Sequence, residues 1–284
     1  MMGIRILITV GALSFSTTAM SADEIWRVED VTMPESMLEL PGQGNIIVSV
    51  MAGAPAAEDG TGYLSLLSSD GEVLQEKWAQ GLNAPKGMAI LGERLFVSDI
   101  TKIRIYDLET GASLEVLSPE GAVFLNDVAS DGESIFVTDM MTDKIWRYRE
   151  GEMHVWMQGS VLNHPNGIHW TGEQLLVGTW GQGLQSDFTT DVPGDLLAID
   201  LESQAVEVIA PALGNLDGID LLGDDIVVSD WIRGAVYQIK PDGEVSLVLE
   251  GAPGLADIST TETGVLLVPE MLEGRLRAVS LPDL

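Results

Sequence analysis

The sequence predicts an all-β fold in which a four-stranded unit is repeated six times, and two regularities carry this prediction. Six related segments place a polar anchor residue at intervals of 51, 40, 40, 51 and 40 residues. Thirteen residues after each of the last five anchors, a second polar marker ends a short apolar run. A repeat near 40 residues with strand-like runs is typical of propeller blades, so we expect a six-bladed β-propeller. The anchors are Glu35, Lys86, Asn126, Asn166, Asp217 and Asp257, and the markers are Asp99, Asp139, Thr179, Asp230 and Glu270.

The second repeat shows the expected blade most clearly. Strands are predicted over 87–91, 94–100, 102–108 and 113–117, with turns at Gly92-Glu93 and at Glu109-Thr110-Gly111. The third and fifth repeats have turn residues at the matching places, as hairpin loops require.

The two ends of the chain predict how the ring closes. Only 27 residues follow Asp257, which is enough for three strands, expected over 258–261, 265–268 and 275–281. The missing outer strand of the last blade is expected from residues 24–31 (EIWRVEDV). Pairing the two ends would remove an exposed sheet edge and hold the ring closed.

The two longer repeats carry their extra residues after the second strand, near 51–61 and 181–194. In a four-stranded blade this connection lies on the same face as the anchors, and blades 1 and 4 stand opposite each other in a ring of six. We therefore expect two loops that overhang a central pocket from opposite sides. Neutral surface insertions are the other interpretation.

The N-terminus predicts export. Residues 1–22 carry a single charge, Arg5, then an apolar stretch and small residues that end at Ala22. This pattern indicates a cleaved signal peptide, with residues 23–284 forming one propeller domain in the periplasm or outside the cell. The stretch is short for the alternative, a membrane anchor.

Composition restricts the chemistry and the partners. The chain has no cysteine, which excludes thiolate zinc sites and cysteine nucleophiles. Its 14 Lys and Arg stand against 44 Asp and Glu, a net charge of −30. Such a surface repels nucleic-acid phosphates and anionic lipids, so we expect neither nucleic-acid binding nor stable membrane insertion.

In a closed ring the anchors converge on one axis, and a Glu, two Asn and an Asp among them would form a cage of oxygen ligands. Calcium takes six to eight oxygen ligands, and two carboxylates with two amide carbonyls supply oxygens without excess charge. The pattern predicts a site for Ca²⁺ or another divalent cation. The anchors expected to form this site are Glu35, Asn126, Asn166 and Asp217.

These positions resemble the SMP-30/gluconolactonase family, whose relatives, the paraoxonase-like lactonases, share the layout. The most specific segments are His164-Pro165-Asn166-Gly167 and Leu216-Asp217-Gly218, and the resemblance covers nearly the whole mature chain. It implies a divalent metal, commonly calcium, at the top of the channel, and Asp217 as the general base. It further implies that the metal ligands are Glu35, Asn166 and Asp217, with Asn126 contacting metal or substrate.

The resemblance implies a metal-dependent hydrolase of a lactone or related ester, acting on a small-molecule substrate. A metal there would polarise the substrate carbonyl and stabilise the developing oxyanion. No G-x-S-x-G nucleophile motif is present. Two alternatives stay open. One is a non-catalytic extracytoplasmic propeller that binds a small ligand or a protein partner on its top face. The other is a different reaction on the same layout, such as condensation or isomerisation.

Other residues near the expected channel have open roles. Lys86 could pair with Glu35 and replace the charge of a metal, bind an anionic substrate, or help stabilise an oxyanion. Trp180 and Trp231 each follow a marker by one residue, so they could form a substrate-binding wall or simply pack between blades. His164 lies two residues before Asn166 and could act as an accessory proton shuttle.

For these residues a purely structural role is the alternative to a functional one. Asn166-Gly167 and Asp217-Gly218 are also ordinary turn pairs. In the first blade the chain has Pro34-Glu35-Ser36 where the family usually has Glu-Gly-Pro, which leaves Met37 as an alternative register. The recurring aspartate markers are expected to bond backbone groups rather than to take part in chemistry.

Overall fold

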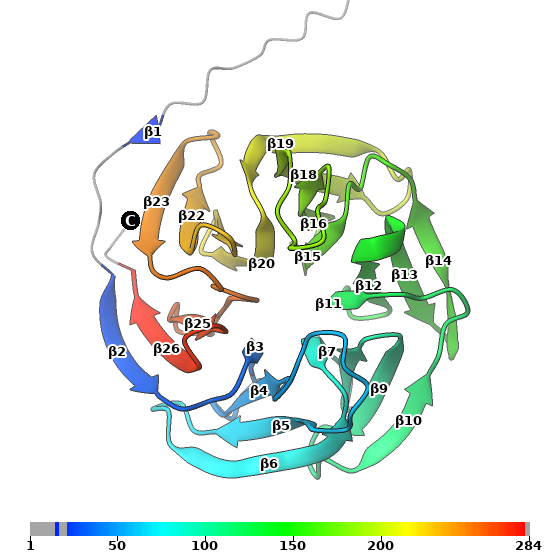
Figure 1. Cartoon of the computed structure of the whole chain (residues 1–284), viewed down its shortest axis with the longest axis vertical. Helices are drawn as coiled ribbons and strands as arrows, with labels where there is room; N and C mark the ends of the chain where they lie inside the picture. Colours follow the sequence, from blue (N-terminus) through cyan, green and yellow to red (C-terminus); the bar gives the residue numbers. More distant parts are fainter. Residues whose placement is uncertain (1–14, 17–21, 282–284) are drawn as a thin grey trace, which may run out of the picture.

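The computed structural model describes residues 15–16 and 22–281, and these form the six blades of a β-propeller around a central channel (Figure 1). The predicted fold is therefore confirmed. The predicted signal peptide over 1–22 lies almost wholly outside the described residues and stays a prediction. Its described part, β1 (Phe15–Ser16), pairs in parallel with the outer strand of blade 5.

The first three blades are four-stranded antiparallel sheets that follow the chain outward from the channel. Blade 1 consists of β3 (Pro34–Glu39), β4 (Ile46–Val50), β5 (Gly62–Leu67) and β6 (Val73–Leu82). Blade 2 consists of β7 (Pro85–Leu91), β8 (Arg94–Asp99), β9 (Lys102–Asp107) and β10 (Ser113–Leu117). Blade 3 consists of β11 (Leu125–Ser130), β12 (Ile135–Asp139), the 3₁₀ turn η1 (Met140–Thr142), β13 (Lys144–Arg149) and β14 (Glu152–Gln158).

The last three blades repeat this order with two variations. Blade 4 consists of β15 (Pro165–Trp170), β16 (Gln174–Thr179), β18 (Val192–Asp200) and β19 (Val206–Gly214), and its long loop contains β17 (Gly181–Gln182), which pairs with β18. Blade 5 consists of β20 (Leu216–Leu222), β21 (Asp225–Asp230), β22 (Ala235–Ile239) and β23 (Val245–Glu250). Blade 6 consists of β24 (Ser259–Thr260), β25 (Leu266–Glu270), β26 (Arg275–Ser280) and β2 (Asp23–Val28). Among the described residues, no helix has the length and apolarity needed to cross a membrane.

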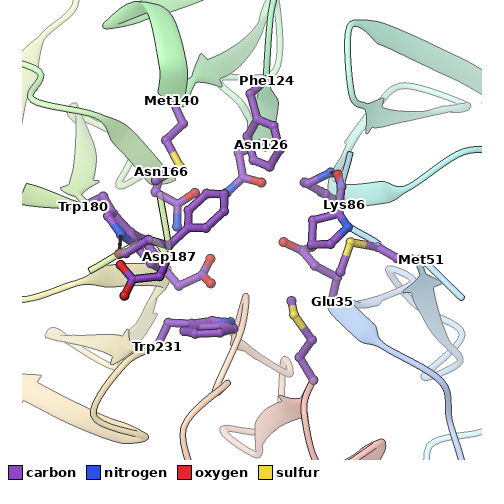
Figure 2. A pocket seen from close by; sticks show the side chains of 14 residues that line it. Glu35, Met51, Lys86, Phe124, Asn126, Met140, Asn166, Trp180, Asp187 and Trp231 are labelled. Atoms are coloured by element: carbon purple, nitrogen blue, oxygen red, sulfur yellow. Dashed lines mark hydrogen bonds between the residues drawn. The ribbon is translucent and has the colours of Figure 1, made fainter. Parts of the chain in front are cut away.

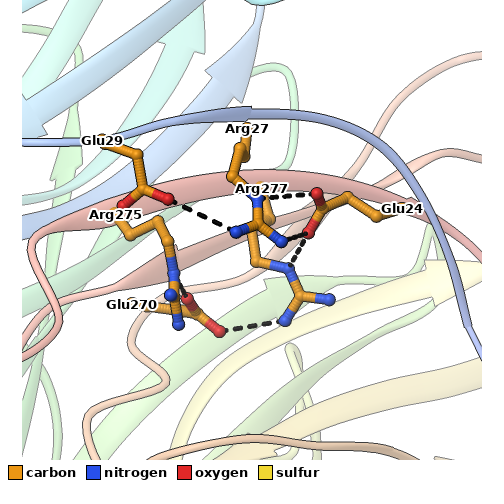
Figure 3. A network of polar contacts seen from close by, with 6 residues as sticks. All are labelled: Glu24, Arg27, Glu29, Glu270, Arg275 and Arg277. Carbon is orange, nitrogen blue, oxygen red and sulfur yellow. Dashed lines mark hydrogen bonds and ion pairs between the residues drawn. The ribbon is translucent and has the colours of Figure 1, made fainter.

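The two ends of the chain close the ring in blade 6, as predicted. β2 pairs with β26 as its outer strand, although the two strands are separated by almost the whole chain. Arg277 on β26 binds Glu24 on β2 at 3.0 Å and the buried Glu270 on β25 at 3.0 Å (Figure 3). Arg275 also pairs with Glu270. Charged groups from three strands therefore join the first and last segments of the domain.

β24 is shorter than the four residues predicted for it. The backbone N–H of Asp257 donates to the carbonyl of Glu35 at 3.0 Å, and Ser36 forms a parallel bridge with Asp257. The segment before β24 therefore pairs with blade 1 as well as with its own blade, where Leu255 forms an antiparallel bridge with Glu270.

Apolar side chains fill the six seams between neighbouring blades. Second strands such as β4 and β12 are buried along their whole length, because both of their faces meet another blade. This explains their continuous runs of Val, Ile and Phe. The outer strand β10 is mostly exposed. The cores therefore lie between the blades, and polar anchors from the first strands reach the channel.

Candidate functional site

A β-bulge at the start of the first strand directs the anchor residues into the channel. In blade 3 the pairing jumps from Leu125 with Asp139 to Val128 with Val137, so Asn126 and Asp127 are both left out of the ladder. Blades 2, 4 and 5 have the same irregularity. Since a bulge releases residues from strand pairing and re-aims their side chains, two neighbouring residues can point along the channel axis.

Hydroxyl groups on the second strands hold these bulges in place. Thr138 Oγ1 accepts a hydrogen bond from the N–H of Asp127 at 3.0 Å and donates to the carbonyl of Asn166, in the next blade, at 2.7 Å. Ser229 bonds in the same way to Gly218 and to Ala256, both at 2.9 Å. Each hydroxyl therefore satisfies a backbone group that the bulge exposes and binds the following blade at its anchor or at the residue before it.

The glycines after Asn166 and Asp217 serve close packing, not turns. The pairs Asn166-Gly167 and Asp217-Gly218 lie within the first strands of their blades, β15 and β20. A Cβ atom on Gly167 would stand 1.8 Å from the carbonyl oxygen of Asp217, and one on Gly218 would stand 2.0 Å from the N–H nitrogen of Ile258. Neighbouring first strands approach too closely for any other residue. The turn interpretation of these pairs is therefore wrong.

The upper part of the channel opens into a pocket of about 590 Å³ (Figure 2). The pocket is lined by 14 residues, and polar anchors from five blades are among them. In blade 1 the anchor in this pocket is Glu35, whereas Met37 packs into the seam with blade 6. The anchors that the structure brings together here are Glu35, Lys86, Asn126, Asn166 and Asp217.

A second acidic layer lies below this pocket. Ligand oxygens of Glu35, Asp127 and Asp257 lie within 4.8 Å of one another, a group that could hold a metal ion. Glu35 and Asp127 are buried, while Asp257 is partly open to a cavity on the other side of the channel. Asp257 also accepts a hydrogen bond from Ser36 at 2.5 Å. The sequence interpretation omitted Asp127 and gave Asp257 no role, although Asp257 is the sixth anchor and Asp127 directly follows the third.

The channel contains buried oxygen atoms that no protein group satisfies. Glu35, Asn166 and Asp217 each have one such oxygen, and both carboxylate oxygens of Asp127 are without a partner. The amide nitrogen of Asn166 donates to the carbonyl of Leu216 at 3.1 Å, which turns its oxygen away from that contact. Every unsatisfied side-chain atom in the described channel is an acceptor, and a cation is the partner that such a set lacks.

Burial and mutual repulsion oppose ionisation of these carboxyl groups. Burial raises the pKa of Glu35 well above its ordinary value, and the charges of Asp217 and Asp257 raise it further. The pKa values of Asp127 and Asp217 are also raised well above normal, first by burial and then by Asp257. Burial raises the pKa of Asp257 to about 7, against the hydrogen bond from Ser36. A divalent cation would remove this repulsion.

Lys86 does not form an ion pair with Glu35. Its ammonium donates to the carbonyls of Pro55 at 2.9 Å and Ala84 at 3.0 Å, and it lies 4.7 Å from the centre of the Phe124 ring. None of the carboxylates described in the channel lies within 4.0 Å of its nitrogen. Burial lowers the pKa of Lys86 to about 8, while Glu35 is the first of the acidic groups that oppose this shift. Lys86 therefore does not satisfy the buried carboxylate oxygens that lack a partner.

The long loops of blades 1 and 4 reach the pocket from opposite sides, as expected. Pro55 comes from the first loop, and Asp187 and Phe188 come from the second. Trp180 and Trp231 stand in the pocket wall with ring centres 5.9 Å apart. The structure does not bring His164 into this pocket. Its ring nitrogen Nδ1 lies 3.0 Å from the carbonyl of Met140.

The aspartate markers bond backbone groups, as predicted. Asp99 accepts from the N–H groups of Asn83 and Ala84, both at 2.9 Å. Asp139 and Asp230 accept from the corresponding segments of their own blades. These carboxylates fix the chain just before each anchor and take no part in the pocket.

No protein-family model matches the chain, and no curated protein matches it in sequence. Its fold is similar to that of a gluconolactonase from Xanthomonas campestris, with 17% identity and a TM-score of 0.68 over 89% of this chain and 88% of that one. It is also similar to a virginiamycin B lyase from Staphylococcus aureus, with 12% identity and a TM-score of 0.59 over 90% of this chain and 98% of that one.

A third similar structure is a nidogen/laminin complex, with 14% identity and a TM-score of 0.59 over 88% of this chain and 92% of that one. At these identities the similarities show the shared fold alone. Two of the three structures are named as enzymes and the third as a protein complex. The choice between catalysis and binding therefore rests on the residues of the channel.

Proposed function

We propose that this protein is a divalent-metal-dependent hydrolase of lactones or related esters. The observation that carries the proposal is the set of unsatisfied buried oxygens on Glu35, Asn166 and Asp217, which line the open pocket, and on Asp127 in the layer below it. Calcium is the proposed ion, because it takes many oxygen ligands in flexible geometry. The similar fold of a gluconolactonase supports the same proposal.

The proposed metal ligands are Glu35, Asn166 and Asp217, with Asn126 beside them. When bound, the cation would polarise the substrate carbonyl and lower the pKa of a bound water. Asp217, which lines the pocket, would accept the proton of the attacking water as the general base. The water oxygen forms the new bond to the carbonyl carbon, the ester C–O bond breaks, and the leaving oxygen takes up a proton.

Lys86 and Asn126 would position the substrate. Two of the three donor directions of the Lys86 ammonium are used by Pro55 and Ala84, which leaves one for a substrate oxygen. Asn126 lines the pocket beside it and offers an amide N–H. Both could therefore stabilise negative charge on the carbonyl oxygen as it develops.

The test is a rate measurement on purified protein, stripped with a chelator and then reloaded with Ca²⁺, Mg²⁺ or Mn²⁺. Initial rates would be followed on a panel of lactones and aryl esters. We expect metal-dependent hydrolysis that falls about 100-fold or more in Asp217→Asn. The control is Asp242→Asn, an exposed turn residue of the same blade. Folded, metal-loaded protein without hydrolysis on the panel would favour the alternative, a binding propeller.

We also propose export, on the composition of residues 1–22. Mass spectrometry of protein recovered from the extracytoplasmic fraction is expected to show an N-terminus near Ala22. Full-length protein retained in the cytoplasm would contradict this.

A further inference from the structure

The wall above the proposed metal ligands is apolar and largely aromatic. Phe124, Met140 and Trp180 form one packed cluster, against which Trp231 also packs. Phe188 and Met271 complete the wall on the remaining sides. Figure 2 shows the ring of Trp231 and the sulfur atoms of Met51 and Met140 around the same space as the polar side chains.

Two polar groups of this wall, Trp180 Nε1 and Asp187 Oδ1, are engaged by the protein. Trp180 Nε1 donates to the carbonyl of Phe188 at 2.8 Å. Asp187 accepts hydrogen bonds from the backbone and the hydroxyl of Thr189, at 3.1 and 2.7 Å. A substrate with several hydroxyl groups would lose water here and find few replacement partners, which opposes its binding.

The loop of blade 4 holds an aromatic side chain over the pocket in an uncommon backbone conformation. Phe188 has a φ of +66°, in the left-handed region that bulky residues rarely adopt. The bond from Trp180 and a turn bond from its N–H to Gln185 at 3.0 Å hold it there. Its ring lies 6.5 Å from that of Phe124. A backbone conformation of this kind is typical of a loop that positions a side chain for function.

We propose that the substrate carries an alkyl or aryl group beside its ester or lactone carbonyl, and that this group packs against Phe124, Trp180, Phe188 and Trp231. The reacting carbonyl would lie at the polar floor while the apolar group fills the upper pocket. This assignment rests on the proposed function for the carbonyl, but the apolar contact can be measured without turnover. It excludes polyhydroxylated sugar lactones as the preferred substrates.

The test is calorimetric binding of γ-lactams, the cyclic amides that replace the hydrolysable ester oxygen with N–H. One series carries alkyl chains of increasing length, and the comparison ligand is a polyhydroxylated lactam of similar size. We expect affinity to rise up to about fourfold per added methylene until the pocket is full. The polyhydroxylated lactam should bind at least tenfold more weakly than the alkyl lactam of its size.

Two matched variants identify the surface that binds the ligand. Phe188→Ala should weaken alkyl-lactam binding about tenfold or more. Leu114→Ala, which truncates an exposed apolar side chain on the outer strand β10, should leave it unchanged. Tighter binding of the hydroxylated lactam, no dependence on chain length, or equal effects of the two variants would each overturn the proposal. If alkyl lactams bind as expected and no lactone is hydrolysed, the assignment of the apolar surface stands and only the hydrolase proposal fails.

Discussion

At the scale of single residues, the channel is defined by acceptors without donors. Asp127 has both carboxylate oxygens buried and unsatisfied, and Glu35, Asn166 and Asp217 each contribute one more. Buried polar atoms in folded proteins are almost always satisfied, so five such oxygens in one channel are not ordinary core packing. Lys86 is close by, but its hydrogen bonds go to backbone carbonyls.

The raised pKa of Asp257 predicts how stability depends on pH without metal. Its pKa is about 7 in the folded protein against a reference value of 3.8. The folded state therefore binds more protons than the unfolded state between these values, and stability is lost as pH rises toward and through 7. The loss is on the order of 2–4 kcal/mol, reduced where water reaches Asp257.

The measurement is urea unfolding of chelator-treated protein between pH 5 and pH 8. The midpoint should fall as pH rises, and Asp257→Asn should make the fall smaller, while the raised pKa values of Glu35, Asp127 and Asp217 keep part of it. Calcium should reverse the trend, because protons and metal compete for the same oxygens. An unfolding midpoint that does not change with pH in the metal-free parent protein would contradict the raised pKa of Asp257.

Much of the upper site could be predicted from residue positions, and the lower acidic layer could not. The fixed spacing places Glu35, Asn126, Asn166 and Asp217 at one mouth of the channel, where the structure has them. Asp127 was missed because alternation in a regular strand would turn it away from its neighbour's direction. The bulge between Leu125 and Val128 removes that alternation. His164 was expected near Asn166, but its positive φ of 61° and its contact with Met140 place it elsewhere.

At the scale of strands, the hydroxyl that precedes each of the three aspartate markers links neighbouring blades. Thr138 satisfies Asp127 in its own blade and Asn166 in the next. In the sequence, this hydroxyl belongs to the Ser or Thr that precedes the aspartate in the segments VSD, VTD and VSD. The same residue thus stabilises the bulge and positions two candidate ligands.

Thr138→Val should therefore affect both stability and metal binding. Valine has a similar shape but neither donates nor accepts, which leaves two buried backbone groups unpaired. We expect a loss of about 1–3 kcal/mol in the free energy of unfolding, together with weaker calcium affinity. Thr263→Val, in an exposed turn, should change unfolding by less than about 0.5 kcal/mol. Equal denaturation midpoints for both variants would argue against this role.

At the scale of the whole molecule, ring closure depends on a strand from the N-terminal side of the domain. The repeat spacing and the short final repeat predicted this closure, since three strands cannot complete a four-stranded blade. The pairing of Asp257 with blade 1 could not be predicted, because it depends on contact between blades that are distant in sequence. The network around Glu270 (Figure 3) adds charge pairing to the closure.

Glu270→Gln tests the contribution of this network. Glu270 is buried and accepts from both Arg275 and Arg277. Loss of its charge should lower the free energy of unfolding by about 1–3 kcal/mol. Glu133→Gln, which breaks the exposed pair with Arg149, should cost less than about 1 kcal/mol. In a urea titration, an unchanged slope of the unfolding free energy against urea concentration would show that only stability has changed.

The most direct test of the account is thermal unfolding of the metal-stripped protein with and without calcium. A ligand that binds only the folded state stabilises it by about 2.7 kcal/mol at one hundred times its Kd. For a domain of this size we expect the Tm to rise by about 5–10 °C. The rise should be largely lost in Asp217→Asn and in Asp127→Asn, and retained in Asp242→Asn. No rise in the parent protein, or an equal rise in all four proteins, would contradict a cation site in the channel.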